Sequence, residues 1–184
     1  MGKTRTFQEI ESLENEIAEQ QKKLAQLRRE LVGRPIDKDY ELIGQSGKVK
    51  LSELFGNKQH LVIIHNMGMA CPFCTMWADG FNGLYKHVVE GTYTNKPAAF
   101  VVVSPDTPAQ QSEGKKTRGW TFPMYSNGDS PFTRDMGFQD NKGFGPGCST
   151  FSRDPKGNIR LVSQSSFGPG DPFCSVWHFV DMLD

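Results

Sequence analysis

Two cysteines, Cys71 and Cys74, are the residues of this chain whose type and spacing most directly suggest chemistry. They stand in the stretch HNMGMACPFCTMWADG, with Pro72 and Phe73 between them and an apolar run shortly before them. Two thiols at this spacing have three typical uses: redox chemistry, one half of a metal site, or a former active site that has kept its cysteines. The elements on either side of the pair help to choose among these uses.

The sequence around the pair predicts a strand followed by a helix. The run QHLVIIHNM (59–67) has the β-branched residues of a buried strand, and residues 72–90 have a helical pattern. Cys71 is therefore expected at a helix N-terminus, where unpaired N–H groups and the helix dipole stabilise a thiolate, and Pro72 suits the first turn. Cys74, one turn later, is placed to attack a mixed disulfide on Cys71 and release the product. We predict that Cys71 is the exposed nucleophile and Cys74 the more buried resolving thiol.

A metal site is the alternative from a different class of function. The four cysteines and His65 are ligand types for zinc or an iron–sulfur cluster, and C-x-x-C is a common half of such sites. Cys148 and Cys174 do not form a second C-x-x-C, so the spacing favours redox use and we expect no bound metal. We interpret these two residues as buried thiols, with a second redox pair as the alternative.

Short strands and helices alternate through the rest of the chain. Buried strands are expected at 59–67 and 98–106, and a hairpin is expected around residues 155–158. Helices are expected at 72–90, 106–118, 130–137 and 173–183. This order predicts an α/β fold, a central mixed sheet flanked by helices.

Residues 7–32 differ from the rest because they contain no Gly or Pro and are rich in strong helix formers. Their apolar residues repeat in steps of three and four, with Gln20 at the one vacant position. The repeating residues are Ile10, Leu13, Ile17, Leu24, Leu27 and Leu31. Gly33 and Pro35 end the helix. We therefore divide the chain into an N-terminal amphipathic helical arm, 1–34, and a domain, 35–184.

The charges along this helix bear on whether two copies pair through it. A parallel pair would set Glu9 against Glu14 and Lys23 against Arg28, so like charges would meet and this arrangement is disfavoured. An antiparallel pair brings Glu16 to Lys23 but opposes two glutamates, so its charge signal is mixed. A homo-oligomer formed through the helix and a helix packed along its own domain or a neighbour both fit the pattern.

The composition restricts which partners the protein can bind and in which cellular compartment it is expected. Twenty-one Lys and Arg residues balance 21 Asp and Glu residues, so no overall field attracts nucleic acid or an anionic membrane. The longest apolar runs have the length of strands, and the N-terminal stretch lacks the apolar region of a signal peptide. Four cysteines are too few to staple a secreted protein of this length. We expect a cytoplasmic protein that binds neither nucleic acid nor membrane.

The motif and its framework resemble the thioredoxin-like superfamily from about residue 40 to the end of the chain. LVIIHNMGMACPFC (61–74) and WTFPMYSNGDSPFTRDMGF (120–138) look like segments of its alkyl-hydroperoxide-reductase and thiol-disulfide-exchange branch, and CPFC is similar to glutaredoxin motifs. More narrowly, CPFCTMWADGFNGL, the charged N-terminal helix and GWTFP resemble the bacterial thioredoxin-like family called domain of unknown function 899. The resemblance implies a thioredoxin-like fold; that family has no settled activity.

Two positions depart from the thioredoxin pattern. Thioredoxins place an acid six residues before the first cysteine and beneath the second, and here that position holds His65. The resemblance implies that His65 accepts the proton of Cys74, and a hydrogen-bonded core histidine is the alternative. Thioredoxins also carry a cis-proline at the mouth of the site, where this chain has Cys148 with Pro146 two residues earlier. We favour a shifted loop in which Pro146 faces the dithiol, because the neighbouring glycines can absorb the shift, over one in which Cys148 faces it.

A peroxiredoxin-like peroxidase is the closest enzymatic alternative. Peroxiredoxins carry a Pro-x-x-x-Thr-x-x-Cys pattern at the attacking cysteine, and NMGMAC (66–71) has neither the proline nor the threonine. A thioredoxin-like interaction domain without catalysis is a further alternative.

The preferred hypothesis is thiol–disulfide exchange on a disulfide-bearing protein or a small thiol. Cys71 and Cys74 are the catalytic pair and His65 the proton shuttle, and no cofactor is expected beyond the redox-active Cys71–Cys74 disulfide. Substrate contacts are expected from Pro72, Phe73, Trp120, Pro146, Gly147 and Cys148.

Overall fold

The computed structural model describes residues 6–183, so residues 1–5 of the expected arm lie outside the described residues. The chain divides into two compact units, of which the first ends at Gly33 and the second begins at Arg34. Within the described part of the chain, no helix is long and apolar enough to cross a membrane.

The first unit is the helix α1, Phe7–Glu30. Thr6 is its N-cap: the N–H of Glu9 donates to Thr6 Oγ1 (3.2 Å), and the N–H of Thr6 donates to Glu9 Oε2 (2.8 Å). This reciprocal capping box satisfies two backbone donors that a helix start leaves unpaired. No side chain of α1 is buried.

The second unit is built on an eight-stranded sheet. Its strands are β1 (Arg34–Ile36), β2 (Glu41–Gly44), β3 (Gly47–Lys50), β4 (His60–His65), β5 (Ala98–Ser104), β6 (Met124–Ser126), β9 (Gly147–Arg153) and β10 (Ile159–Ser166). They lie in the order β1-β10-β9-β4-β5-β6-β2-β3. The β4–β5 and β5–β6 pairs are parallel and the other pairs are antiparallel, so the sheet is mixed. A separate two-stranded ribbon consists of β7 (Gln139–Asp140) and β8 (Gly143–Phe144).

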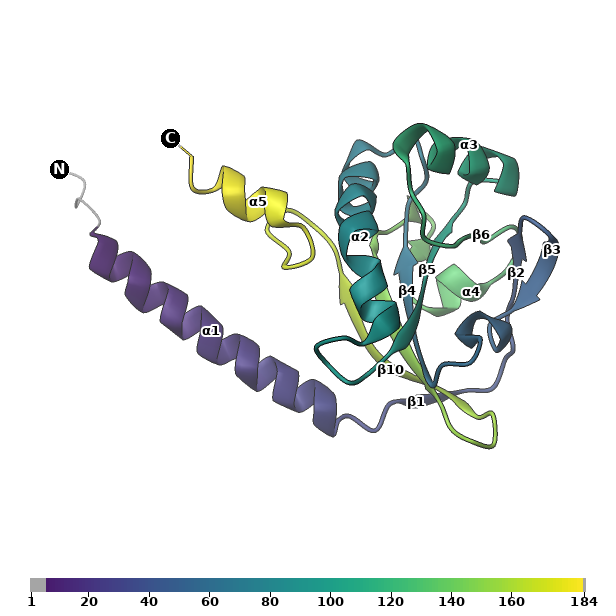
Figure 1. The fold of residues 1–184 in the computed structure, drawn as a ribbon, viewed down its shortest axis with the longest axis horizontal. Coiled ribbons are helices and arrows are strands. Elements are labelled where there is room, and N and C mark those ends of the chain that lie inside the picture. The colour runs from purple at the N-terminus through teal and green to yellow at the C-terminus, as the bar shows by residue number, and fades with distance from the viewer. Residues whose placement is uncertain (1–5, 184) are drawn as a thin grey trace. The chain divides into compact units, whose positions relative to one another are not determined.

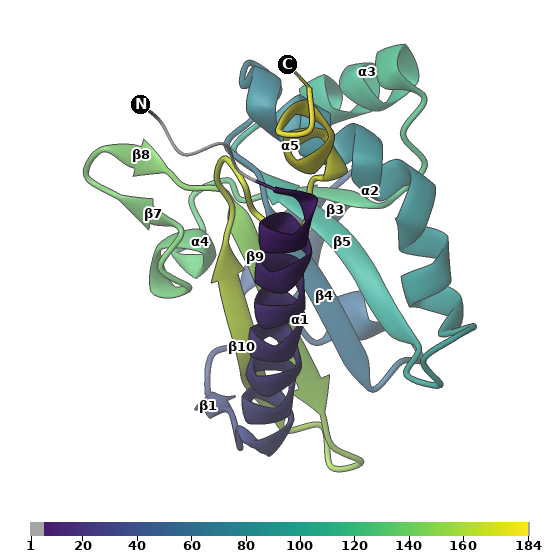
Figure 2. The ribbon, with the colours of Figure 1, turned by 90° about the vertical axis from the view of Figure 1, so that its left-hand side faces the viewer.

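Helices cover both faces of this sheet. They are α2 (Pro72–Glu90), α3 (Pro108–Arg118) and α4 (Phe132–Asp135), with a short 3-10 helix η1 at Glu53–Phe55. A last short helix, α5 (Ser175–Val180), follows β10 along the chain. Figure 1 shows α2 lying along β4 and β5, and Figure 2 shows α2 and α4 on opposite sides of these strands. The expected fold class, a mixed sheet flanked by helices, is confirmed.

Two apolar clusters fill the spaces above and below the sheet. On β4, Ile64 packs with α2, whereas Leu61 and Ile63 pack with α4 and η1. This division follows from the strand geometry, because successive side chains of a strand point to opposite faces. Successive residues of β4 therefore point in turn towards the cluster that contains the dithiol and towards the cluster that contains α4.

Most expected elements are present, and their bounds differ by a few residues. The helix expected at 72–90 is α2, and the hairpin expected around residues 155–158 is β9–β10. The strands β1, β7 and β8 were not predicted, since two or three residues are too few to show a two-residue period.

Candidate active site

The dithiol lies at the turn where strand β4 leads into helix α2. Cys71 is the N-cap residue of α2, with an extended backbone (φ −87°, ψ 113°), and Pro72 is the first helical residue. Cys71 Sγ accepts a hydrogen bond from the backbone N–H of Cys74 at 3.3 Å. The thiol thus occupies the place of a capping oxygen at the positive end of the helix dipole.

Cys74 is much more enclosed than Cys71. Its side chain is 2% exposed, whereas Cys71 is only partly buried, and both are free thiols in this structure. Cys74 Sγ accepts a hydrogen bond from the backbone N–H of Met67 at 3.3 Å. Burial raises the pKa of Cys74 to about 12; the Met67 N–H opposes this, while the Cys71 thiol and the Asp106 carboxylate add to it. The pair therefore combines an accessible thiol with one that holds its proton.

The loop before Cys71 is held by Asp106, a residue that sequence reasoning missed. The backbone N–H of Met69 donates to both carboxylate oxygens of Asp106 (3.1 Å each), and Ser104 Oγ donates to Oδ2 (2.7 Å). Gly68 has φ +111°, and a Cβ there would lie 3.3 Å from Asp106 Oδ1, so glycine permits this close approach. The sequence signal was a polar residue just after a buried parallel strand, because binding sites gather at the carboxyl ends of such strands.

His65 lies on the other side of the sheet from the dithiol. Its ring stacks on Phe138 and Phe132, with centroid distances of 4.1 and 5.6 Å, and Nε2 shares a 2.8 Å hydrogen bond with Ser149 Oγ. The preceding residue of β4 packs in the cluster that contains Cys74, so strand alternation turns His65 away from it. Burial lowers the pKa of His65 to about 3. The expected place beneath Cys74 is not where His65 lies, and its contacts are those of a hydrogen-bonded core histidine.

Pro146, Gly147 and Cys148 lie at the start of β9. Gly147 is buried, and a Cβ there would overlap the Phe138 ring, so this residue offers no surface to a substrate. Cys148 is 8% exposed and packs in the same cluster as Cys74. Pro146 is partly exposed, and no cis peptide bond occurs in residues 6–183. The structure thus places Cys148 on the dithiol side of the sheet but encloses it.

The two aromatic residues expected to contact substrate differ in exposure. Trp120 is 4% exposed, its Nε1–H donates to Asp79 Oδ1 (2.8 Å), and its ring stacks on Phe122. Because Trp120 is part of the core, its expected role in contacting substrate has to be corrected. Phe73 is 51% exposed and its ring lies 6.0 Å from that of Trp177. Phe73 is therefore the aromatic surface at the motif itself.

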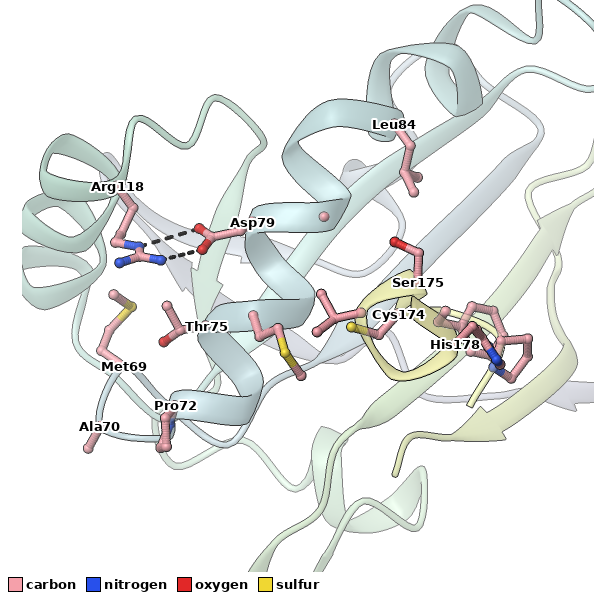
Figure 3. Close-up of a pocket in the computed structure, with 15 residues that line it drawn as sticks. Met69, Ala70, Pro72, Thr75, Asp79, Leu84, Arg118, Cys174, Ser175 and His178 are labelled. Atoms are coloured by element: carbon pink, nitrogen blue, oxygen red, sulfur yellow. Dashed lines mark hydrogen bonds and ion pairs between the residues drawn. The ribbon is translucent and has the colours of Figure 1, made fainter. Parts of the chain in front are cut away.

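A groove of about 840 Å³ begins beside the dithiol and follows α2 (Figure 3). Its lining residues include Met69, Ala70, Pro72, Thr75, Met76, Leu84, Phe173, Cys174, Val176 and His178. Asp79 and Arg118 also line it and form an ion pair with each other, which Figure 3 marks by dashed lines. The groove offers apolar side chains from α2 and from the segment around α5, which sequence spacing did not bring together.

A protein-family model, described as Bacterial protein of unknown function (DUF899), matches residues 5–184. The chain belongs to this family. No curated protein matches this DUF899 chain.

Solved structures share the fold of this DUF899 protein. The bacterioferritin comigratory protein of Xanthomonas campestris, described for its alkyl peroxide reduction activity, is 19% identical with a TM-score of 0.60, covering 82% of this chain and 94% of that one. A PrxQ mutant of Xylella fastidiosa is 19% identical (TM-score 0.58, covering 80% and 91%). Peroxidoxin BcpB of Mycobacterium tuberculosis is 22% identical (TM-score 0.55, covering 74% and 85%). These similarities confirm the thioredoxin-like fold.

The remaining titratable groups do not gather as a metal site. Across residues 6–183, no group of three or more His, Cys, Asp or Glu side chains is arranged to hold a metal ion. Cys174, the N-cap of α5, is 5% exposed and packs in the same apolar cluster as Cys74 and Cys148. At the start of α2, the DUF899 site thus brings together the two thiols of the motif and, behind the preceding loop, the Asp106 carboxylate.

Proposed function

We propose that this protein is a thiol–disulfide oxidoreductase in which Cys71 and Cys74 carry two electrons. The observation that carries the proposal is the asymmetry of the pair at the start of α2: Cys71 caps the helix and is accessible, whereas Cys74 is buried and its pKa is raised to about 12. An accessible thiol at a helix N-terminus suits attack, and an enclosed neighbour one turn away suits resolution.

The exchange follows from this arrangement in two steps. The Cys71 thiolate attacks one sulfur of a substrate disulfide, the substrate S–S bond breaks, and one substrate thiolate leaves while a mixed disulfide forms on Cys71. Cys74 then attacks Cys71 Sγ, its proton passes to the departing second thiolate, and the Cys71–Cys74 disulfide closes. The substrate gains two electrons and the enzyme dithiol loses them, and the reverse sequence oxidises a substrate dithiol.

The groove along α2 supports a protein disulfide as the substrate class. It starts at Ala70 and Pro72, next to the attacking thiol, and continues past Met76 to Leu84. On a helix, the twelve positions from Pro72 to Leu84 span about 18 Å, enough for several residues of an extended chain. Exposed Phe73 adds an apolar contact on the motif. A small thiol would use only the end of the groove at the motif.

The first test replaces each cysteine of the motif in turn. We expect Cys71→Ser to abolish disulfide reduction, because the attacking sulfur is lost. Cys74→Ser should accumulate a mixed disulfide with the substrate, because nothing resolves it, and mass spectrometry would detect this adduct. Cys148→Ser serves as the matched control, because this enclosed thiol does not line the groove, and it should keep most of the activity. Equal activity in Cys71→Ser and Cys74→Ser would contradict the proposal.

A thiol peroxidase is the second candidate, and the structural likeness to the alkyl-peroxide-reducing protein of Xanthomonas campestris is the observation in its favour. In that reaction the Cys71 thiolate attacks the hydroperoxide, the O–O bond breaks to release an alcohol, and the sulfenic acid condenses with Cys74 to a disulfide and water. The position three residues before Cys71 is Gly68, which offers no hydroxyl group. Stopped-flow measurements of the rates at which an alkyl hydroperoxide and a disulfide oxidise the reduced protein would distinguish the two candidates. A faster reaction with the hydroperoxide would favour the peroxidase.

A further inference from the structure

The helix α1 presents an apolar stripe to solvent along its whole length. Six residues of the three-and-four repeat are each 46–57% exposed, and Phe7 at the start of the helix is 91% exposed. The six are Ile10, Leu13, Ile17, Leu24, Leu27 and Leu31. An isolated helix gains little stability from propensity alone, so a stripe of this kind is stabilised by burial against a partner.

The charges of α1 are divided between its two halves. The first half carries Glu9, Glu11, Glu14, Glu16 and Glu19, and the second carries Lys22, Lys23, Arg28 and Arg29, followed by Glu30. A second copy of the same helix running the other way would bring a basic half to each acidic half. The charge distribution of α1 therefore complements itself, which favours another copy of this chain as the partner.

We propose that α1 pairs with α1 of a second copy in an antiparallel arrangement. The numbers of opposite residues add to 37 within the apolar stripe and to 39 along the flank that carries Glu16 and Lys23. This register sets the first residue of each helix level with the last residue of the other, so the two helices overlap over their full length of about 36 Å. Leu13 faces the partner's Leu24, and a shallow hollow on this face is lined by Leu13, Ile17, Gln20 and Leu24 among others. The polar Gln20 meets an isoleucine of the partner, not a second glutamine.

The flanking charges favour this register once hydrogen bonds are considered. Glu16 faces the partner's Lys23, and two-fold symmetry creates this attractive pair twice. Glu9 faces the partner's Glu30 at the ends, but both carboxylates are engaged within their own helix: Glu9 accepts from the N–H of Thr6 (2.8 Å) and Glu30 accepts from Gln26 Nε2 (2.8 Å). Solvent screens the opposed glutamates at these exposed ends.

The test measures the dimer dissociation constant of the full-length protein and charge variants by sedimentation equilibrium. We expect Lys23→Glu and Glu16→Lys each to raise the dissociation constant by about tenfold or more, since each creates two like-charge pairs. The double variant Glu16→Lys, Lys23→Glu restores opposite charges and should return to within about threefold of the original value. Lys22→Glu is the matched control: it makes the same charge change beside Lys23, on the outer face of the helix, and should have a small effect.

A single variant separates the antiparallel pair from a parallel one. In a parallel pair Lys23 faces the partner's Arg28, so Lys23→Glu would strengthen the dimer. Tighter association of Lys23→Glu would therefore overturn the proposal. A protein that stays monomeric over about a hundredfold range around micromolar concentration, or a double variant that fails to regain affinity, would also overturn it. Far-UV circular dichroism of each variant verifies that α1 is still helical.

Discussion

At the scale of single residues, the enclosure of Cys74 is the feature on which the chemistry depends. Its thiol is removed from water, accepts one N–H bond from Met67, and lies within the field of the Asp106 carboxylate. Burial and the negative charge both favour the protonated thiol. Cys74 is therefore protonated and weakly nucleophilic in the reduced protein. It reacts once a mixed disulfide on Cys71 places the Cys71 sulfur within its reach.

Asp106→Asn should lower the pKa of Cys74, because the variant removes the negative charge that opposes the thiolate. The amide oxygen of Asn can still accept the Met69 N–H, so the loop should keep its place. The ultraviolet absorbance of the thiolate, titrated in protein whose other three cysteines are replaced by serine, measures this pKa. Asp140→Asn on the exposed ribbon is the control. An unchanged or raised pKa would show that the carboxylate does not act on Cys74.

His65 should make the protein less stable in mild acid. Above about pH 6.5 its ring is neutral in both the folded and the unfolded state, so it adds no pH dependence. As the pH falls from about 6.5 towards 3, the unfolded chain binds a proton that the folded chain, with a pKa of about 3, does not bind. The free energy of unfolding should therefore drop by roughly 2 kcal/mol between about pH 8 and about pH 5 on account of this residue.

Urea unfolding of His65→Phe at the two pH values measures that drop. The variant keeps a ring for Phe138 to stack on, and its pH-dependent loss should be smaller than that of the unchanged protein by about the same 2 kcal/mol. If the free energy of unfolding depended on pH in the same way in His65→Phe and in the unchanged protein, His65 would not be the cause of the loss in acid.

Some residues of the site could be placed from the sequence and others could not. The places of Cys71 and Cys74 depend on a strand, a short loop and a helix that follow one another, so local patterns sufficed. The face of the sheet on which His65 lies depends on how β4 is packed. Counting six residues back from Cys71, as in thioredoxins, therefore predicted the wrong face. Asp106 lies far along the chain and reaches the dithiol only because β5 pairs with β4. Trp120 was expected to contact substrate, although an indole of its size is mostly buried in folded proteins.

At the scale of elements, β9 and the segment after α4 pack so closely that they leave no room for a side chain at Gly147. Gly147 pairs with His65 across β4 and β9, and the Phe138 ring covers it. A Cβ at Gly147 would overlap that ring and lie 2.6 Å from the carbonyl oxygen of Ser165. The ring cannot move without disturbing its stacking on His65.

Gly147→Ala should therefore lower the free energy of unfolding by about 1–3 kcal/mol, the usual cost of overpacking. Gly168→Ala is the matched control, because a Cβ there meets nothing within 4 Å. The control should change stability by at most about 0.5 kcal/mol. Denaturant unfolding of both variants measures the difference, and equal stabilities would show that Phe138 yields easily.

The order of the elements along the sheet could not be read from the sequence. Alternating strands and helices predicted a mixed sheet, and that class is confirmed. The pairing of β10 with β9 is a local hairpin, whereas its pairing with β1 joins residues more than a hundred positions apart, such as Arg34 with Leu161. Local periodicity carries no information on such pairs.

At the scale of the whole molecule, the balance of charges governs solubility. Lys and Arg equal Asp and Glu in number, so the net charge at pH 7 is zero with neutral histidines. Molecules without net charge repel each other least. Solubility in a precipitant series should pass through a minimum near pH 7 and rise severalfold on either side, and a continuous rise through neutrality would contradict this expectation.

The edges of the eight-stranded sheet also bear on how copies of the protein meet. The outermost strands are β1, which is three residues long and contains Pro35, and β3, which carries Lys48 and Lys50. A proline removes a hydrogen-bond donor from its edge, and lysines on an edge strand must lose their water before another strand can dock. Polymerisation by strand addition, the route to cross-β fibrils, is thus blocked at both outermost strands.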